Sequence, residues 1–119
     1  MEVYDTANNL AQEIKRSEQF TNYKKIKEKL FAIPEMKQKI IEFEQLKEEL
    51  QLMEVKQKNN DEINEEDKKV KLIKLYNTLV ENKDIKEYFD AEIAFNTMMI
   101  DINKILGDSI KEVLFYGDK

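Results

Sequence analysis

The chain has 119 residues, a net charge of −5, and neither Cys nor His. Disulfides, thiolate metal ligands, Cys nucleophiles and the commonest general base are therefore excluded. Two Gly and one Pro are too few for the turns of a β-rich fold, whereas 38% charged residues suit exposed helix faces. We therefore expect an all-α protein in which residues 1–119 form a single helical domain.

Partners and location follow from apolar content and charge. No apolar run approaches the ~20 residues of a membrane-spanning helix, and the N-terminus M-E-V-Y-D does not read as a signal peptide. We expect a cytoplasmic protein without membrane insertion, and the acidic balance argues against nucleic acid as its partner. Lys15 to Lys39 nevertheless holds eight basic residues against three acidic ones. Solvated helix faces explain most such runs, and contact with an acidic surface or with RNA is the alternative.

The first third predicts two amphipathic helices. Asp5 can cap the first one, whose apolar stripe runs from Ala7 to Ile14. Ser17 has the character of a second N-cap, so a bend or short break is expected at residues 16–18.

The middle of the chain predicts a long helix, a polar loop and a fourth helix. Pro34 suits the first turn of the third helix, which we expect from Glu35 to Lys56. Residues 56–64 are polar and read as an inter-helix loop, with Asn64 as the cap of the fourth helix.

The last third predicts the second long helix, from Asp84 to Leu106. Asp84 and Glu87 match a capping box, after a short loop that begins at Glu81. Gly107 leaves two alternatives open, a break or straight continuation.

Two further features concern the C-terminal end. Ser109 and Glu112 repeat the capping-box spacing just after Gly107. Residues 117–119 are expected to form a frayed tail. The expected architecture is a compact bundle of about five helices, two of them long.

The last helix is apolar on more than one side, which predicts more than one neighbour. Its main apolar side carries Tyr88, Phe89, Phe95, Met99 and Ile102, and a second apolar row on another side is formed by Ile93, Met98 and Ile105. One chain offers few helices to cover both, so we expect a twofold homodimer with this helix at the interface. Met98→Lys or Phe95→Asp should weaken association. The candidate interface residues, for a second copy or another protein partner, are Tyr88, Phe89, Phe95, Met98, Met99, Ile102 and Ile105.

Polar residues of the same helix admit two interpretations. Glu92, Asn96 and Asn103 interrupt its apolar faces. They are either solvated edges of those faces or buried polar groups that fix the register of a helix–helix interface.

No pattern in the chain predicts a reaction. Di-iron bundles need His, and Gly107 and Gly117 alone cannot make a phosphate-binding loop. We expect no catalytic residues, no cofactor and no metal site. The alternative is a small metal-dependent enzyme that uses the carboxylates of the last helix, namely Glu87, Asp90, Glu92 and Asp101.

Several motifs together carry a family resemblance. They are V-Y-D-x-A-x-x-L-A, I-K-x-S-E-x-F-x-x-Y-K, F-x-x-L-K-x-E-L-Q, Y-F-D-A-E-x-A-F-N and D-I-N-K-I-L, in that order along the chain. From Val3 to about Tyr116 the chain resembles the YlbF/YmcA/YheA family of bacterial proteins, and its short length and L-F-Y-G ending look most like the YheA branch.

The resemblance implies an all-helical, dimeric, cytoplasmic protein without catalytic activity. It implies a regulatory or adaptor role through helix contacts, linked to competence, sporulation, biofilm formation and mRNA processing by an endoribonuclease. Some relatives hold an iron–sulfur cluster through C-terminal cysteines, and that cofactor does not carry over because this chain has no Cys. Ile33 stands where the family often has Asp before the third helix.

Overall fold

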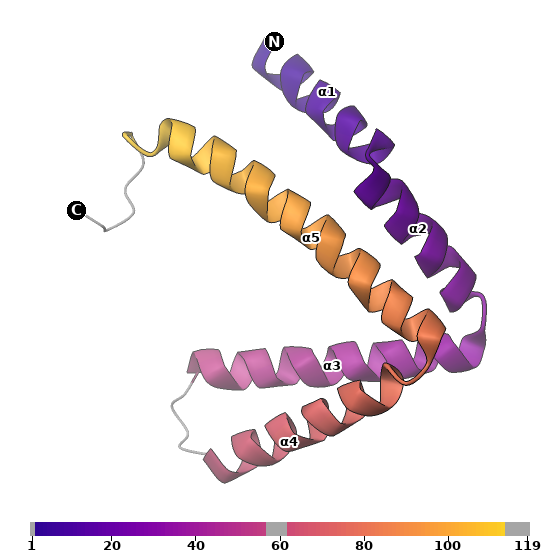
Figure 1. Ribbon diagram of the computed structural model, residues 1–119. Coiled ribbons are helices and arrows are strands. Elements are labelled where there is room, and N and C mark those ends of the chain that lie inside the picture. Colours follow the sequence, from indigo (N-terminus) through magenta and orange to yellow (C-terminus); the bar gives the residue numbers. More distant parts are fainter. Residues whose placement is uncertain (1, 57–61, 114–119) are drawn as a thin grey trace. The chain divides into compact units, whose positions relative to one another are not determined.

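The computed structural model describes residues 2–56 and 62–113, and within them it contains helices and no strand (Figure 1). The all-α class is therefore confirmed, as are two long helices, α3 and α5, of 23 and 28 residues. The helices are α1 (Glu2–Arg16), α2 (Glu18–Phe31), α3 (Pro34–Lys56), α4 (Glu62–Leu79) and α5 (Lys83–Ile110). None of them, within the described ranges, is long and apolar enough to cross a membrane.

Ser17 separates α1 from α2, as the sequence predicts. Its hydroxyl oxygen accepts a hydrogen bond from the amide of Phe20 at 3.1 Å. The same hydroxyl donates to the carbonyl oxygen of Ile14 at 2.6 Å, so one side chain ends α1 and caps α2. The predicted start of α1 at Asp5 is wrong, because the helix begins at Glu2. The carboxylates of Glu2 and Asp5 both lie in its first turn, where the helix dipole favours negative charge.

The predicted loop at 56–64 is too long. Helix α3 ends at Lys56, as expected, but α4 already begins at Glu62. Asn64 therefore lies inside the first turn of α4 and is not its cap. Acidic residues are favourable in a first turn, so the helix can extend upstream of Asn64. Residues 57–61 and the predicted tail at 117–119 lie outside the described residues.

The cap of α5 lies two residues before the predicted one. The side-chain oxygen of Asn82 accepts hydrogen bonds from the amides of Asp84 at 2.8 Å and Ile85 at 3.2 Å. Asn and Asp are equally good N-caps, so residue type alone could not choose between Asn82 and Asp84. The capping-box prediction at Asp84 is wrong, and Asp84 instead lies in the first turn of α5.

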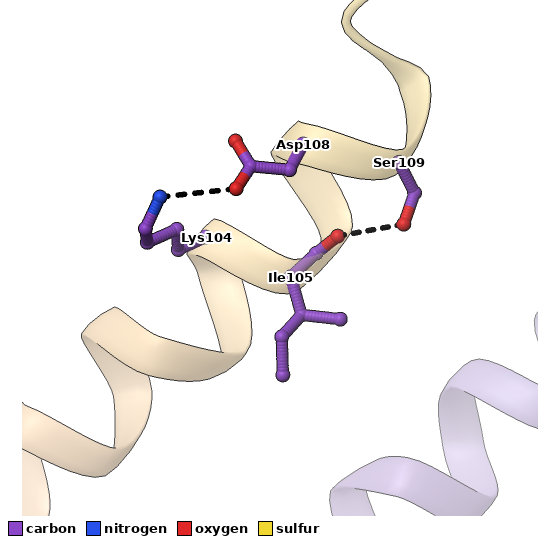
Figure 2. A network of polar contacts seen from close by, with 4 residues as sticks. All are labelled: Lys104, Ile105, Asp108 and Ser109. Carbon is purple, nitrogen blue, oxygen red and sulfur yellow. Dashed lines mark hydrogen bonds and ion pairs between the residues drawn. The ribbon is translucent and has the colours of Figure 1, made fainter.

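At its other end, α5 continues straight through Gly107 to Ile110. The hydroxyl of Ser109 donates to the carbonyl oxygen of Ile105 at 2.8 Å, one turn earlier in the same helix (Figure 2). Ser109 therefore bonds back into α5 and does not cap a new helix, so the capping box predicted at Ser109 and Glu112 is wrong.

The chain divides into two compact units. Unit 1 comprises Met1–Lys25 and Phe89–Lys119, and unit 2 comprises Ile26–Tyr88. The division falls inside α2 and α5, so each of these two helices contributes residues to both units.

Unit 2 is built on the antiparallel pair α3 and α4, which lie side by side (Figure 1). The rings of Phe43 and Tyr76 meet across this pair with centroids 6.0 Å apart, and Lys68 forms an ion pair with Glu49 at 3.2 Å. Leu30, Ile40, Phe43, Leu50, Leu79, Ile85 and Tyr88 are its buried apolar side chains.

Unit 1 has an aromatic cluster between α2 and α5. The ring of Phe95 lies 5.9 Å from that of Phe20 and 5.7 Å from that of Tyr23, measured between centroids. The hydroxyl of Tyr23 donates to a carboxylate oxygen of Glu92 at 3.4 Å. In contrast, α1 contributes no buried residue to the unit.

Candidate functional site

The predicted interface residues of α5 change from buried to exposed along the helix. Tyr88 and Phe89 are only 3% and 4% exposed in the single chain, whereas Ile105 is 64% exposed. The remaining four are half-buried: Phe95, Met98, Met99 and Ile102. Large apolar side chains thus lose their cover toward the C-terminal end of α5.

Phe95 has contacts within its own chain that complicate its use as a probe of association. It packs on Phe20 and Tyr23, so a charge at this position would disturb unit 1 directly. Met98→Lys places the charge at a half-buried position outside that aromatic cluster.

A second set of exposed apolar residues on α5 includes Ile93, which the sequence places in an apolar row, together with Ile100 and Ile110, which no predicted row contains. Ile93, Ile100 and Ile110 are 58%, 63% and 49% exposed. With the residues between them they form what we call the isoleucine row: Ile93, Asn96, Ile100, Asn103, Gly107 and Ile110. The steps along this row alternate between three and four residues, so a continuous helix aligns them on one side.

The predicted row that joins Ile93 to Met98 and Ile105 does not follow one side of α5. In a regular helix, five residues correspond to roughly 140° of rotation, so Met98 does not share a side with Ile93. The seven-residue step from Ile93 to Ile100 and on to Gly107 was the available signal. A break at Gly107, which the sequence alone also allows, would end this spacing there, so the row can be recognised only once α5 is known to continue to Ile110.

Other apolar side chains of unit 1 are also exposed. Leu106 and Val113 are 51% and 78% exposed on the C-terminal side, and Val3 and Tyr4 of α1 are 78% and 70% exposed. Single exposed apolar residues are ordinary, but a set that follows one helix is typical of an interaction surface.

The polar residues in and beside the isoleucine row differ in exposure in the single chain. Asn96 and Asn103 are exposed, whereas Glu92 is half-buried beside Tyr23. Lys104 forms an ion pair with Asp108 at 3.0 Å, one turn further along α5 (Figure 2). The hydrogen bond and the positive charge of Lys104 lower the pKa of the Asp108 carboxyl below its ordinary value of 3.8.

The structure also describes the residues of the two alternative sites, the carboxylates of α5 for a metal ion and the lysines for RNA. Glu87, Asp90 and Asp101 are exposed on α5. Across residues 2–56 and 62–113, no group of three or more acidic, His or Cys side chains is placed to hold a metal ion. In the basic stretch from Lys15 to Lys39, the lysines that would contact RNA are all exposed, namely Lys24, Lys25, Lys27, Lys29, Lys37 and Lys39.

Several bacterial proteins are similar to this chain over most of their length. A UPF0342 protein of Halothermothrix orenii is 37% identical over 106 residues, which cover 89% of this chain and 86% of the relative. A UPF0342 protein of Caldicellulosiruptor bescii is 36% identical over 120 residues, covering 98% of each chain. One from Symbiobacterium thermophilum is 32% identical and covers 91% of this chain and 93% of the relative.

No solved structure matches the chain significantly. A family-level match spans residues 3–111, which include all of α2, α3, α4 and α5 and nearly all of α1. The description of that family is "Control of competence regulator ComK, YlbF/YmcA". This protein therefore belongs to the YlbF/YmcA family, as its motifs predict.

Proposed function

We propose that this protein is a non-enzymatic, cytoplasmic regulatory adaptor that works as a homodimer and binds other proteins through α5. The observation that carries the proposal is the exposed apolar surface along α5, from Ile93 to Ile110. An adaptor needs such a surface, because burial of apolar area supplies most of the free energy of protein association.

The free energy of covering an apolar side chain is large enough to favour a partner on this surface. Covering a large apolar side chain contributes about 1.5–3 kcal/mol. Each half-buried or exposed member of the candidate interface gains part of that amount when a partner covers it, namely Phe95, Met98, Met99, Ile102 and Ile105. Met side chains also adapt to partners of different shape, which suits an adaptor.

The family supports regulation as the role. Its description refers to the control of a competence regulator and names no reaction. For this chain we propose the same broad role, with competence, sporulation, biofilm formation and mRNA processing as the processes to examine. Protein contacts on α5 would transmit the effect.

The test compares partner capture by two charge variants of the full chain in a bacterium that carries its gene. Ile105→Asp introduces a charge into the candidate interface, whereas Ile73→Asp does so at a position of α4 that is 58% exposed. We expect Ile105→Asp to lose the proteins that co-purify with the wild type, and Ile73→Asp to keep them. Circular dichroism of both variants checks that they remain helical.

Two results would contradict the proposal. The first is capture of the same proteins by Ile105→Asp and the wild type. The second is calorimetric binding of Mg²⁺, Mn²⁺ or Ca²⁺ tighter than millimolar, which would favour the metal-dependent enzyme. A steeply salt-dependent affinity for RNA would point to the lysine-rich region instead.

A further inference from the structure

The isoleucine row has the form of one side of a two-helix coiled coil. Its alternating three- and four-residue steps are those of the a and d positions of a heptad. Three of its members are large isoleucines that remain about half exposed or more in the single chain. The apolar side chains on the other sides of α5 cannot cover this row, because they project from the same helix in other directions.

We propose that this row pairs with the same row of a second copy in antiparallel orientation, with Ile93 of one copy opposite Ile110 of the other. The inference rests on the proposed homodimer and specifies its geometry. In this register, Asn96 lies opposite Gly107, and Ile100 lies opposite Asn103.

Side-chain size supports the register. Reversal of the row brings its two terminal isoleucines together and places Asn96 against the residue without a side chain, Gly107. The glycine lets the two backbones approach and leaves room for the amide of Asn96. A surface that fits its own reversed copy forms a closed twofold contact, which is how most homodimers assemble.

Charge supports the orientation. Among the side chains that flank the row, Asp90 stands near its N-terminal end and Lys111 near its C-terminal end, whereas the charge of Lys104 is already paired with Asp108. Antiparallel pairing in this register brings Asp90 of one copy within about two residues, or roughly 3 Å along the helix axis, of Lys111 of the other. Parallel pairing would bring equal charges to the same level and align the two helix dipoles unfavourably.

The continuity of α5 is essential to the inference. Gly107 and Ile110 belong to the row only because the helix runs unbroken to Ile110. The back-bond from Ser109 to Ile105 and the ion pair between Lys104 and Asp108 both lie within this last stretch (Figure 2).

The absence of Cys from the chain makes cross-linking a direct test. We would prepare full-length Ile93→Cys and Ile110→Cys separately, with a mass tag on one. Each variant is oxidised alone and after the two have been mixed, unfolded and refolded together. In the mixture we expect at least tenfold more cross-linked dimer than in either variant alone.

Geometry explains the expected difference. A disulfide needs Cα atoms about 4.4–6.8 Å apart. In the antiparallel pair, residue 93 of one copy lies beside residue 110 of the other, but two residues 93 are separated by roughly 25 Å along the helices. Ile100→Cys mixed with Asn103→Cys provides a second pair in the same register. Ile73→Cys on α4 serves as the control and should not cross-link.

The possible results separate this inference from the proposed function. Equal cross-linking by Ile93→Cys alone would show a parallel pair and overturn the orientation. Absence of cross-linking at both pairs, with a wild type of two-chain mass, would overturn the isoleucine row as the contact and leave the homodimer standing. A folded monomeric wild type would overturn both.

Discussion

Asn82 and Ser17 show how single side chains set the limits of the helices. Each accepts backbone hydrogen bonds that the first turn of a helix cannot satisfy by itself. Asn82 is the more demanding case, since its one oxygen serves two amides while its amide nitrogen lies 3.9 Å from the sulfur of Met36 on α3.

Replacement of Asn82 by Ala should lower the free energy of unfolding by about 1 kcal/mol, because two amides at the start of α5 lose their acceptor. Urea titration followed by circular dichroism measures the change. Asn82→Asp should retain most of the stability. Asp84→Asn is the matched control, since the side chain of Asp84 is not the cap, and a loss there as large as in Asn82→Ala would contradict the assignment.

The Asp108 carboxyl should titrate below its ordinary pKa of 3.8, because Lys104 donates a hydrogen bond to it and adds a favourable charge. A carboxyl whose pKa is lowered by folding stabilises the fold above its unfolded pKa and stops doing so as the pH falls through the lowered value. Both side chains are largely exposed, at 70% and 56%, so no measurable change in unfolding free energy is expected.

Carbon-13 NMR of the Asp108 side chain measures this pKa directly. In Lys104→Met the midpoint should return toward 3.8. An identical midpoint in the wild type and in Lys104→Met would show that the ion pair is not formed in solution.

At the scale of elements, the pair α3 and α4 holds several of the buried apolar side chains of unit 2, namely Ile40, Phe43, Leu50 and Leu79. Leu50 is 8% exposed and Ile40 only 1%, whereas Val55 on the same helix is 80% exposed. Because Leu50 and Val55 lie on the same helix but differ in burial, substitutions at the two positions distinguish the contribution of core packing from that of helix propensity.

Leu50→Ala should destabilise the protein by about 2–5 kcal/mol, because it removes buried methyl groups and leaves a cavity. Val55→Ala should change stability by less than about 0.5 kcal/mol. Denaturant unfolding of the two variants measures both free-energy changes, provided that the dependence of the unfolding free energy on denaturant concentration has the same slope in each. Equal effects of the two substitutions would show that this end of α3 does not pack as described.

Much of this element structure was predictable from sequence. The break at Ser17 and the end of α3 at Lys56 follow from residue types with strong positional preferences. The ends that were wrong are places with two acceptable residues, such as Asn82 and Asp84 at the start of α5. Local preference cannot choose between them, and tertiary packing does.

The candidate surface was predicted only in part, and the reason is geometric. The apolar content of α5 was evident, but sides of a helix can be assigned only if the helix is continuous. With a break possible at Gly107, the heptad spacing from Ile93 to Ile110 could not be followed. Which apolar side chains are covered within the chain is a property of the fold: Tyr88 is 3% exposed and Ile105 64%.

At the scale of the whole molecule, both units contain parts of α2 and α5, and the exposed apolar residues of α5 lie in unit 1. Ile100→Asp places a charge in the middle of the isoleucine row and should therefore convert the dimer into folded monomers. Two isoleucines are lost per dimer, and each is 63% exposed in the single chain, so that each gains only part of the about 1.5–3 kcal/mol of a fully buried side chain. The dissociation constant should therefore rise more than about tenfold. Sedimentation velocity across a concentration series measures it.

Val55→Asp is the matched control for that variant. It places the same charge at an apolar position of α3 that is 80% exposed. It should leave the dissociation constant within about threefold of the wild type, since exposed substitutions change free energies by about 0.5 kcal/mol or less. If both variants dissociate equally, the effect is general charge repulsion and α5 is not the interface.

The central claim is that the apolar surface of α5 is covered by a second copy of the chain. Light scattering coupled to size-exclusion chromatography, at micromolar concentration, tests it most directly. One chain has a mass of 14.2 kDa, and the wild type should elute with twice that mass and a helical circular dichroism spectrum. A helical species of 14.2 kDa that persists across the concentration range would contradict the claim.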